Sequence, residues 1–395
     1  MQLKKKTQLE VFPLAEVQRG DTKTRSRFRE DIVPYGADNL YPDKMELLAQ
    51  QSPQASSSLS LLFDYLFGFG FADQYDDIVV NRRGDTLYDV AYQLVKDFTT
   101  YQGFALHFNY DLTLQKSECT AVPFKRVRMG ERNNSGVVPY YYVHDDWATE
   151  SATNPATKYY KYLSSDVDVE HQIMHAGGID SYPGQLLYFT PQKDIYPLTT
   201  FDPITPAVVV DAEVQLYKVN DVKSGFNTSV VFKDPNQYDD SPEGEEMMAG
   251  TRELIKDMSG NSQKLFWLRG IDPAHMDKSI FEILNIPELA DRFAYTEKTS
   301  KEAIIDHFKQ PRVLFSMFEG SALGQSATIY QEASRQYTRN TIRQRNRLSK
   351  GLGEVVKKFP LLENIDTTLE GYHDGLYSNA EDVARAPVPG DSTDA

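Results

Sequence analysis

The sequence predicts an α+β fold in which helices come first, a β-rich stretch follows, and two long helices enclose a small insertion. Three observations support this prediction. Apolar residues recur at helical spacing over residues 42–98, they alternate over residues 104–110, and helical spacing returns on both sides of residues 227–268. We therefore expect a mixed α/β domain whose chain is interrupted by a smaller α/β domain.

The first packed elements follow residues 1–30, which are polar and charged and are expected to form an extended arm. Residues 35–42 read Tyr-Gly-Ala-Asp-Asn-Leu-Tyr-Pro, which is turn chemistry with a proline suited to open a helix. Ser52-Pro53 ends that helix and begins a second one, which Gly68 ends. A third amphipathic helix is predicted from one apolar face, formed by Tyr88, Ala91, Val95 and Phe98.

Strand signals dominate residues 104–200. The alternation over residues 104–110 predicts the first strand, and residues 122–129 and 139–143 are expected to continue the sheet. Residues 150–200 are rich in Tyr, Asp, Ser and Pro, for which we expect short strands and loops.

Two long helices are predicted around a compact insertion. Helical periodicity over residues 206–220 indicates the first helix, and residues 287–309 indicate the second, with Pro311 as its stop. Between them, a strand at 227–232, a helix at 248–258 and a strand at 264–268 predict a β-α-β unit.

The region after Pro311 is predicted to be a loop to Gln325 and then a long helix. Ser326 is a good N-cap for a helix from Ala327 to about Lys350, and Gly351 and Gly353 are expected to break it. The last 43 residues carry nine acids against three bases, which indicates a loosely ordered acidic tail.

Composition restricts the class of protein. The 395 residues are 40% hydrophobic, enough for a real core, and the 24 Tyr and 21 Phe favour subunit contacts. A formal charge of -15 argues against a protein whose entire surface binds nucleic acid, because phosphate binding needs a basic face. One cysteine, Cys119, excludes an intrachain disulfide. No signal peptide or membrane span is indicated, so we expect a cytosolic chain without membrane partners.

Catalytic motifs are weak. His171 and His175 are four residues apart, as in helical zinc sites, but the glutamate expected after the first histidine is missing. The preceding run Asp166-Val167-Asp168-Val169 alternates like a strand, so surface histidines at a strand end are the favoured interpretation. The sequence contains no phosphate-binding P-loop and no nucleophile elbow, and Cys119 has no partnering motif. We expect no enzyme activity and no cofactor, and a metal-dependent hydrolase using His171 and His175 is the alternative.

Two basic groups are the candidate binding sites. Four arginines, Arg335, Arg339, Arg343 and Arg347, are spaced by four, and because each step drifts about 40° around a helix their stripe slants. The stripe could contact phosphates, but in an acidic protein pairing with acids of the same chain or a neighbouring subunit is favoured. Lys309 and Arg312 flank a proline loop and either project toward a duplex or complement a helix dipole.

The order of a helix, a β-α-β insertion, a second helix, a proline loop and a long helix resembles the stem, clip, stem, tunnel loop and wing helix of tailed-phage portal proteins. Several motifs resemble the branch found in phages and prophages of Bacteroidetes: residues 35–42, Ser52-Pro53, residues 67–71, Tyr196-Pro197, residues 223–226 and residues 320–326. In that branch a histidine is commonly followed by Ser/Thr-Pro after the second stem helix. Residues 307–311 read His-Phe-Lys-Gln-Pro and depart from this pattern.

The resemblance implies a portal-type, ring-forming α+β fold. Its expected parts are an arm (1–30), a mixed α/β wing (31–204), stem helices (205–226 and 286–309), a small α/β clip (227–285), a tunnel loop (310–325), a wing helix (326–352) and a short C-terminal crown (353–395). It also implies a homo-oligomeric ring, typically of twelve copies, at one capsid vertex of the virion, assembled in the cytoplasm of the bacterial host. Double-stranded DNA would pass through it during packaging and ejection.

The implied partners are the terminase large subunit, a head–tail adaptor and the major capsid protein. On this basis we expect Lys309, Gln310 and Arg312 to lie nearest DNA, and the four stripe arginines to contact a neighbouring subunit. Another ring-forming connector or capsid component without a stem and clip is the structural alternative. The acidic clip turn is the expected docking surface for partners, with Asp239, Asp240, Glu243, Glu245 and Glu246.

Overall fold

The structure is a computed structural model. It describes residues 31–71, 77–192, 196–223, 229–234, 242–243, 245–247, 249–251, 265–269, 281–284, 288–315, 323–362 and 365–369. The chain divides into two compact units. Unit 1 comprises Met1–Gln50, Ala55–Thr205 and Ile305–Ala395, and unit 2 comprises Gln51–Gln54 and Pro206–Ile304.

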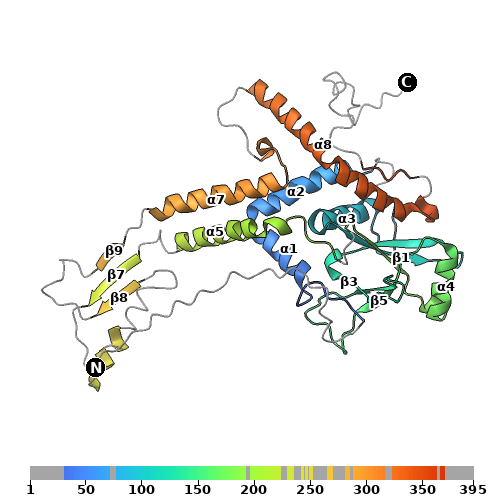
Figure 1. Ribbon diagram of the computed structural model, residues 1–395, viewed down its shortest axis with the longest axis horizontal. Helices are drawn as coiled ribbons and strands as arrows, with labels where there is room; N and C mark the ends of the chain where they lie inside the picture. Colours follow the sequence, from blue (N-terminus) through green and yellow to red (C-terminus); the bar gives the residue numbers. More distant parts are fainter. Residues whose placement is uncertain are drawn as a thin grey trace, which may run out of the picture. The chain divides into compact units, whose positions relative to one another are not determined.

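Three helices begin the described chain: α1 (Tyr41–Gln51), α2 (Pro53–Phe67) and α3 (Leu87–Tyr101), as the apolar spacing predicts (Figure 1). Helix α3 begins with a capping box, in which the Thr86 hydroxyl accepts from the Asp89 amide at 3.2 Å while the Asp89 carboxylate accepts from the Thr86 amide at 3.0 Å. Its inner face is buried, including Val90, Ala91 and Leu94.

A six-stranded sheet forms the β-rich part of unit 1. Its strands are β1 (Phe104–Tyr110), β2 (Lys116–Val122), β3 (Val127–Met129), β4 (Tyr140–Val143), β5 (Thr157–Lys161) and β6 (Gln185–Phe189), in the order β2-β1-β6-β5-β4-β3. Only the β5–β6 pair is parallel among these neighbours. The strand predicted over residues 122–129 is wrong in extent, because Pro123 ends β2 and a short 3-10 helix, Phe124–Arg126, separates it from β3.

One helix was missed. Residues Asp166–Ala176 form α4, so the strand interpretation of Asp166-Val167-Asp168-Val169 is wrong. Two aspartates in the first turn complement the positive end of the helix dipole, and Gly177, with φ 89°, provides the left-handed cap. Because only Val169 of this helix is buried, its sequence lacks the apolar face that marks a core helix.

Helix α8 (Leu323–Val356) is longer than predicted at both ends. Ser326 is not its N-cap, and Gly351 and Gly353 lie inside it. The C-terminal part of α8 packs on the sheet, and Figure 1 shows it and α3 beside the strands. A Cβ atom on Gly351 would lie 2.5 Å from Cζ of Phe104. Gly351 therefore allows close approach of helix and sheet instead of ending the helix.

This packing predicts opposite effects for two neighbouring substitutions. Gly351→Ala should destabilise the protein by about 1–3 kcal/mol, because the new methyl group overlaps the buried ring of Phe104. Gly353→Ala is the matched control and should be neutral or stabilising by up to about 1 kcal/mol, since its nearest neighbour, Thr367 Oγ1, would be 3.6 Å away. Urea unfolding measures both, and equal stabilities of the two variants would contradict the packing.

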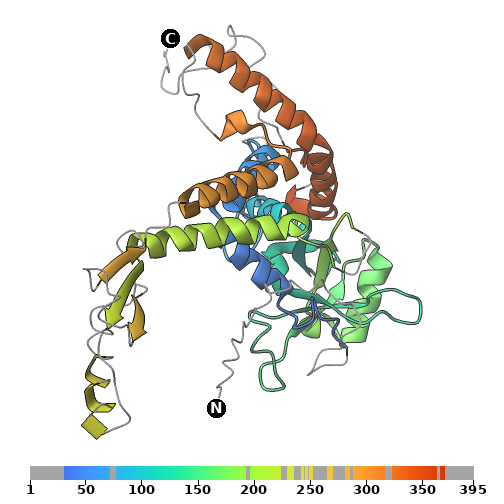
Figure 2. The ribbon, with the colours of Figure 1, turned by 60° about the vertical axis from the view of Figure 1, so that its left-hand side comes forward.

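Unit 2 contains two long helices and a small sheet. Helix α5 (Thr205–Lys223) and helix α7 (Glu288–His307) lie side by side in Figures 1 and 2, and the Lys218 ammonium joins them by an ion pair of 2.5 Å to Glu297. Hydrogen bonds from Lys218 and then Lys301 lower the pKa of the Glu297 carboxyl to about 2. Asp211 of α5 accepts from the Ser52 hydroxyl at 2.6 Å.

The sheet of unit 2 has the order β8-β7-β9, with β7 (Ser229–Asp234), β8 (Leu265–Arg269) and β9 (Phe281–Leu284). Strands β7 and β8 are parallel, as a β-α-β unit requires, and residues 242–243, 245–247 and 249–251 between them are helical. Helical residues thus occur before residue 248, and residue 248 itself and the predicted continuation over residues 252–258 lie outside the described residues. Strand β9, antiparallel to β7, was not predicted.

Candidate functional site

The loop after α7 begins with a backbone conformation that is unusual for lysine. Lys309 has φ 54°, and two hydrogen bonds close the helix end: the Gln310 amide donates to Ile305 O and the Lys309 amide donates to Asp306 O, each at 3.1 Å. This is a Schellman motif, in which glycine usually occupies the position of Lys309. A left-handed lysine is strained by about 1–2 kcal/mol, so its side chain is a candidate for a functional role.

Gln310 is placed differently from its neighbours in the sequence. Its side chain is buried, and Nε2 donates to Ser58 O at 2.7 Å and to the Tyr337 hydroxyl at 3.0 Å. Burial raises the pKa of Tyr337, which therefore stays a neutral phenol able to accept this bond. We expected Gln310 near DNA beside Lys309, but its side chain instead fixes the loop to α2 and α8. Lys309 and Arg312 are exposed, and the Arg312 guanidinium lies 3.6 Å from the exposed Asp306 carboxylate.

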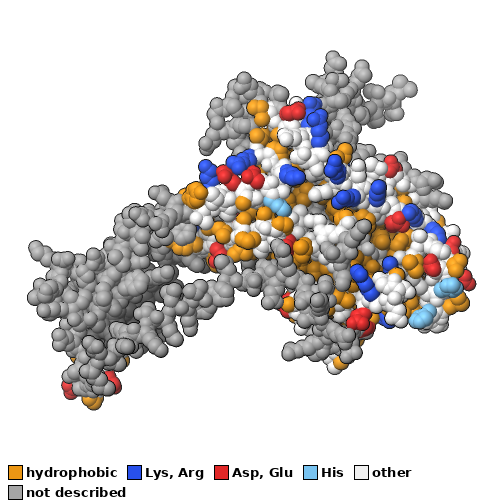
Figure 3. Space-filling model, viewed as in Figure 1, with side chains coloured by type: hydrophobic (Ala, Val, Ile, Leu, Met, Phe, Trp, Pro, Cys, Tyr) orange, Lys and Arg blue, Asp and Glu red, His pale blue; other side chains and the backbone are white. Residues whose placement is uncertain are grey.

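The arginine stripe lies on α8 as predicted. Arg335, Arg339, Arg343 and Arg347 are all exposed, and Figure 3 shows Lys and Arg side chains gathered along this helix. Arg335 pairs with Glu332 at 3.8 Å. No acid of the described residues lies within ion-pair distance of the other three arginines. Unlike these arginines, Arg345 is buried.

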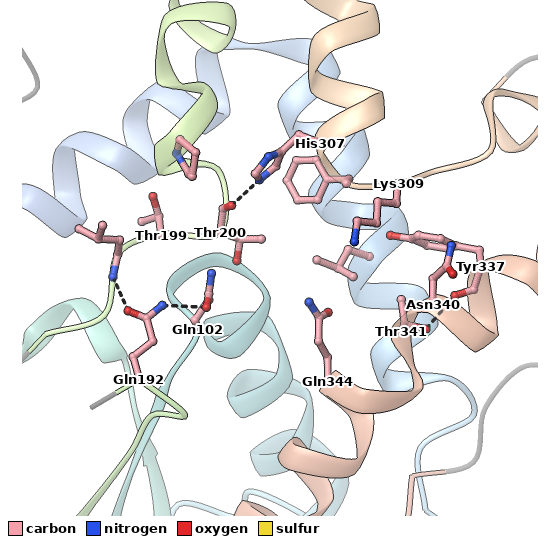
Figure 4. A pocket seen from close by; sticks show the side chains of 14 residues that line it. Gln102, Gln192, Thr199, Thr200, His307, Lys309, Tyr337, Asn340, Thr341 and Gln344 are labelled. Carbon is pink, nitrogen blue, oxygen red and sulfur yellow. Dashed lines mark hydrogen bonds between the residues drawn. The ribbon is translucent and has the colours of Figure 1, made fainter. Parts of the chain in front are cut away.

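A polar cleft of about 410 Å³ opens in unit 1 beside the stripe (Figure 4). None of its lining residues is Asp or Glu. In Figure 4, Lys309 and Gln344 point into the opening from opposite sides. The polar lining side chains come from α3, the segment before α5, the end of α7 and α8, and are Gln102, Gln192, Thr199, Thr200, His307, Lys309, Tyr337, Asn340, Thr341 and Gln344.

Some side chains of the polar cleft are hydrogen-bonded to neighbouring protein groups, and others are not. His307 Nε2 donates to Thr200 O at 2.8 Å, and Gln192 Nε2 donates to Gln102 Oε1 at 2.8 Å. By contrast, within the described part of the chain, Lys309 Nζ and the amides of Asn340 and Gln344 make no hydrogen bond or ion pair with protein atoms. These three groups are therefore available to a bound molecule.

Because the stripe slants around α8, its four arginines do not all face the same side of the helix. A hollow of about 50 Å³ shares Gln102, Thr200 and Gln344 with the polar cleft and adds Arg347 to its wall. Three steps of four residues turn about 120° around a helix, so Arg347 faces the cleft side while Arg335 points away from it. The four arginines, which we expected to act together, thus face two surfaces.

The cleft was missed from the sequence. Tyr337, Asn340, Thr341 and Gln344 recur at intervals of three and four, which is the spacing of one helix face. A series of amide and hydroxyl side chains on the face next to the buried side of α8 is the sequence pattern that could have indicated the cleft. Gln102 and Thr200 are distant in the sequence, and only the fold brings them to the cleft.

The two histidines lie on one helix after all. His171 and His175 are exposed on α4, and His175 Nδ1 lies 2.9 Å from the Tyr160 hydroxyl. Among the described residues no cluster of three or more His, Cys, Asp or Glu side chains could hold a metal. Cys119 is buried, and burial raises the pKa of its thiol to about 12, which disfavours the reactive thiolate.

The acidic clip turn is only partly described. Asp239 and Asp240 lie outside the described residues, whereas Glu243, Glu245 and Glu246 are exposed on the short helix between β7 and β8. None of the described helices is both long and apolar enough to cross a membrane.

Comparison with known proteins identifies a shared fold. No protein family and no curated protein matches the chain. Among solved structures, a chain from the virion of a native gene transfer agent (GTA) particle is similar, with a TM-score of 0.50 and 13% identity over 87% of each chain. Chains from the neck of the native GTA particle, computed with C12 symmetry, and of the empty particle, computed with C6 symmetry, have TM-scores of 0.47 and 0.46. The chain from the native particle's neck is 14% identical over 79% of each chain, and the chain from the empty particle's neck is 13% identical over 82% of each chain.

The first similarity shows that the chain shares its fold with a component of a virion particle. It covers most of both chains and so includes residues of both units. An identity of 13% shows the fold alone, because functional sites vary among proteins that share one.

Proposed function

We propose that the chain is the portal protein of a tailed phage or prophage. The observation that carries this proposal is the fold shared with a virion component over 87% of each chain. The sequence motifs that resemble portal proteins and the helix–sheet–helix order of unit 2 support it. Another ring-forming connector or capsid component would share the virion setting without this order.

The parts of the chain are assigned on the same basis. Helices α5 and α7 are the proposed stem, and the sheet of β7, β8 and β9 between them is the proposed clip. The α/β part of unit 1 is the wing, and α8 is its wing helix. The tunnel loop begins at Gln310 and the crown follows α8. Residues 316–322 of the loop and residues 363–364 and 370–395 of the crown lie outside the described residues.

The charge of the chain suits a DNA channel. A wall that is mostly negative repels the phosphates, so that a duplex can slide, and a few basic side chains give transient contact. With a formal charge of -15, the exposed Lys309 and Arg312 are the proposed DNA contacts. Arg335, Arg339 and Arg343 are the proposed contacts with a neighbouring subunit.

The remaining partners are the terminase large subunit, the head–tail adaptor and the major capsid protein. The acidic turn from Asp239 to Glu246 is the proposed docking surface for the first two. Charge reversal at Glu243, Glu245 and Glu246 should abolish capture of terminase or adaptor in a pull-down, and unchanged capture would reject this surface.

Imaging of the purified protein tests the portal proposal. End-on views of the assembly should show a closed ring, expected to have twelve copies, with a central hole about as wide as duplex DNA. A monomer would contradict the proposal. A ring whose subunits lack a projecting stem would favour the other connector.

The DNA contacts can be tested without disturbing the fold. Lys309→Gly removes the ammonium and places the favoured residue at φ 54°, and Arg312→Ala removes an exposed guanidinium. The double variant should form rings at least as stable, because glycine relieves the strain at φ 54° and the Arg312–Asp306 pair that is lost is exposed. It should package DNA at a rate lower by roughly tenfold, as expected for the loss of two phosphate contacts. Normal packaging would show that this loop does not contact DNA.

A further inference from the structure

The polar cleft has the chemistry of a site for an acidic peptide. It is lined by Lys309 and His307 but by no acid, and Arg347 extends its wall. In a chain with 57 acids against 42 Lys and Arg, a cleft of this size without a carboxylate concentrates positive potential. A negatively charged ligand is therefore favoured there.

The side-chain amides distinguish a peptide from a phosphate. A site for phosphates needs donors alone, whereas the amides of Asn340 and Gln344 each present two donors and one acceptor. A peptide backbone presents both N–H and C=O groups and matches such amides. The cleft volume of about 410 Å³ also lies within the range of about 300–1,000 Å³ typical of ligand sites.

The chain itself contains a matching segment. Residues 370–395 carry six acids and one base, whereas residues 1–30 carry eight bases and four acids. Of these two segments, only residues 370–395 have the negative charge that complements the cleft. The six acids are Glu370, Asp374, Glu381, Asp382, Asp391 and Asp394.

Segment 370–395 is tethered close to the cleft. The described chain just before it lies against α8, because Thr367 Oγ1 would be 3.6 Å from a Cβ on Gly353. Gly353 and Gln344 are nine residues apart on this helix, a separation of about 14 Å along the axis. About five extended residues span that distance. Such short tethers give effective concentrations on the order of millimolar, so that even weak contacts are populated.

We propose that the polar cleft binds the acidic segment 370–395 of the same chain, with Lys309 contacting its carboxylates and Asn340 and Gln344 its backbone. This interaction does not depend on the portal assignment. If Lys309 also contacts DNA, the segment and the phosphates compete for it.

Carbodiimide cross-linking of the full chain tests the proposal, because it joins a lysine amine to a carboxylate in direct contact. Lys309 should link to acids of residues 370–395, and Lys96, exposed on α3 and not lining the cleft, should link to them far less. Asn340→Ala with Gln344→Ala should lower the Lys309 links roughly tenfold, whereas Gln331→Ala with Gln336→Ala, two exposed glutamines of α8 that do not line the cleft, should leave them unchanged.

Mixing isotope-labelled and unlabelled chains identifies the source of each link. Links within one chain support the proposal, and links only between chains overturn it in favour of a neighbouring copy. It is also overturned if Lys309 links to no acid of the segment, or if Lys96 links equally well. Because links within a chain are read in monomers and in rings, this result is independent of the ring imaging.

Discussion

Arg128→Met is expected to destabilise unit 1 by about 3–5 kcal/mol, a large loss for a single substitution. Arg128 lies in β3 and is fully buried. Its guanidinium donates to Asn39 Oδ1 at 2.5 Å, Asn39 O at 2.6 Å, Lys125 O at 2.7 Å and Val127 O at 2.9 Å. Methionine fills much of the volume but supplies none of these donors, so the carbonyls lose their guanidinium partner, whereas Asn39 Oδ1 keeps the bond from the Tyr35 amide at 2.9 Å.

The environment of Arg128 is built from the turn at residues 35–42. Asn39, with φ 63°, brings its carbonyl to the guanidinium, and the turn is fixed by stacking of Tyr35 on Tyr41 and Tyr196. Burial lowers the pKa of Arg128, while nearby tyrosines and Asp43 oppose that shift. An arginine starts far above neutral pH and remains charged, so the site keeps its five donors.

Tryptophan fluorescence measures this loss directly. The Trp147 ring lies 4.9 Å from the guanidinium carbon of Arg128 and reports on unit 1. Trp267 lies in unit 2, so a Trp267→Phe background isolates the signal during urea unfolding. Arg132→Met, at an exposed position four residues away, is the control and should change stability by no more than about 0.5 kcal/mol. A loss below about 1 kcal/mol for Arg128→Met would contradict the role of these hydrogen bonds.

The spacing of apolar residues predicted the helices that bury one apolar face. It failed where contacts distant in the sequence determine the local structure. Helices α2 and α3 bury one apolar face and were predicted from it. Helix α4 buries only Val169 and carries aspartates that alternate with valines, so its pattern imitated a strand. Gly351 was interpreted as a helix stop because the ring of Phe104, which requires a glycine there, comes from a strand 247 residues earlier in the sequence.

The exposure of the charged side chains was predicted from the sequence, whereas the polar contacts around them were missed. The exposed arginines and Lys309 could be identified because four-residue spacing and a helix stop are local signals. Gln310 could not be assigned to the interior, since its partners Ser58 and Tyr337 come from two distant helices. The burial of Arg128 was likewise not evident, because a charged residue is expected at the surface until its partners are known.

Charge reversal of the stripe is expected to abolish ring assembly, a second large effect that follows from the portal proposal. Arg339 and Arg343 are exposed on α8, and the apolar side chain of Ile342, 45% exposed, lies between them in sequence. A mixture of arginine and exposed apolar side chains is typical of protein interfaces. No described acid of the same chain pairs with Arg339 or Arg343, so acids of a neighbouring subunit are the proposed partners.

Arg339→Glu with Arg343→Glu should weaken each subunit contact by about 2 kcal/mol, which is roughly thirtyfold in affinity. A closed ring repeats the same contact at every interface, so the losses accumulate and the variant should sediment as a monomer in analytical ultracentrifugation. Lys96→Glu with Arg132→Glu changes the net charge equally at exposed positions outside α8 and should leave rings intact. Intact rings of the Arg339 and Arg343 variant, combined with weaker DNA binding, would instead assign the stripe to phosphate contact. The stripe and the loop at Lys309 would then form one basic surface, and subunit contacts would have to come from another face of the wing.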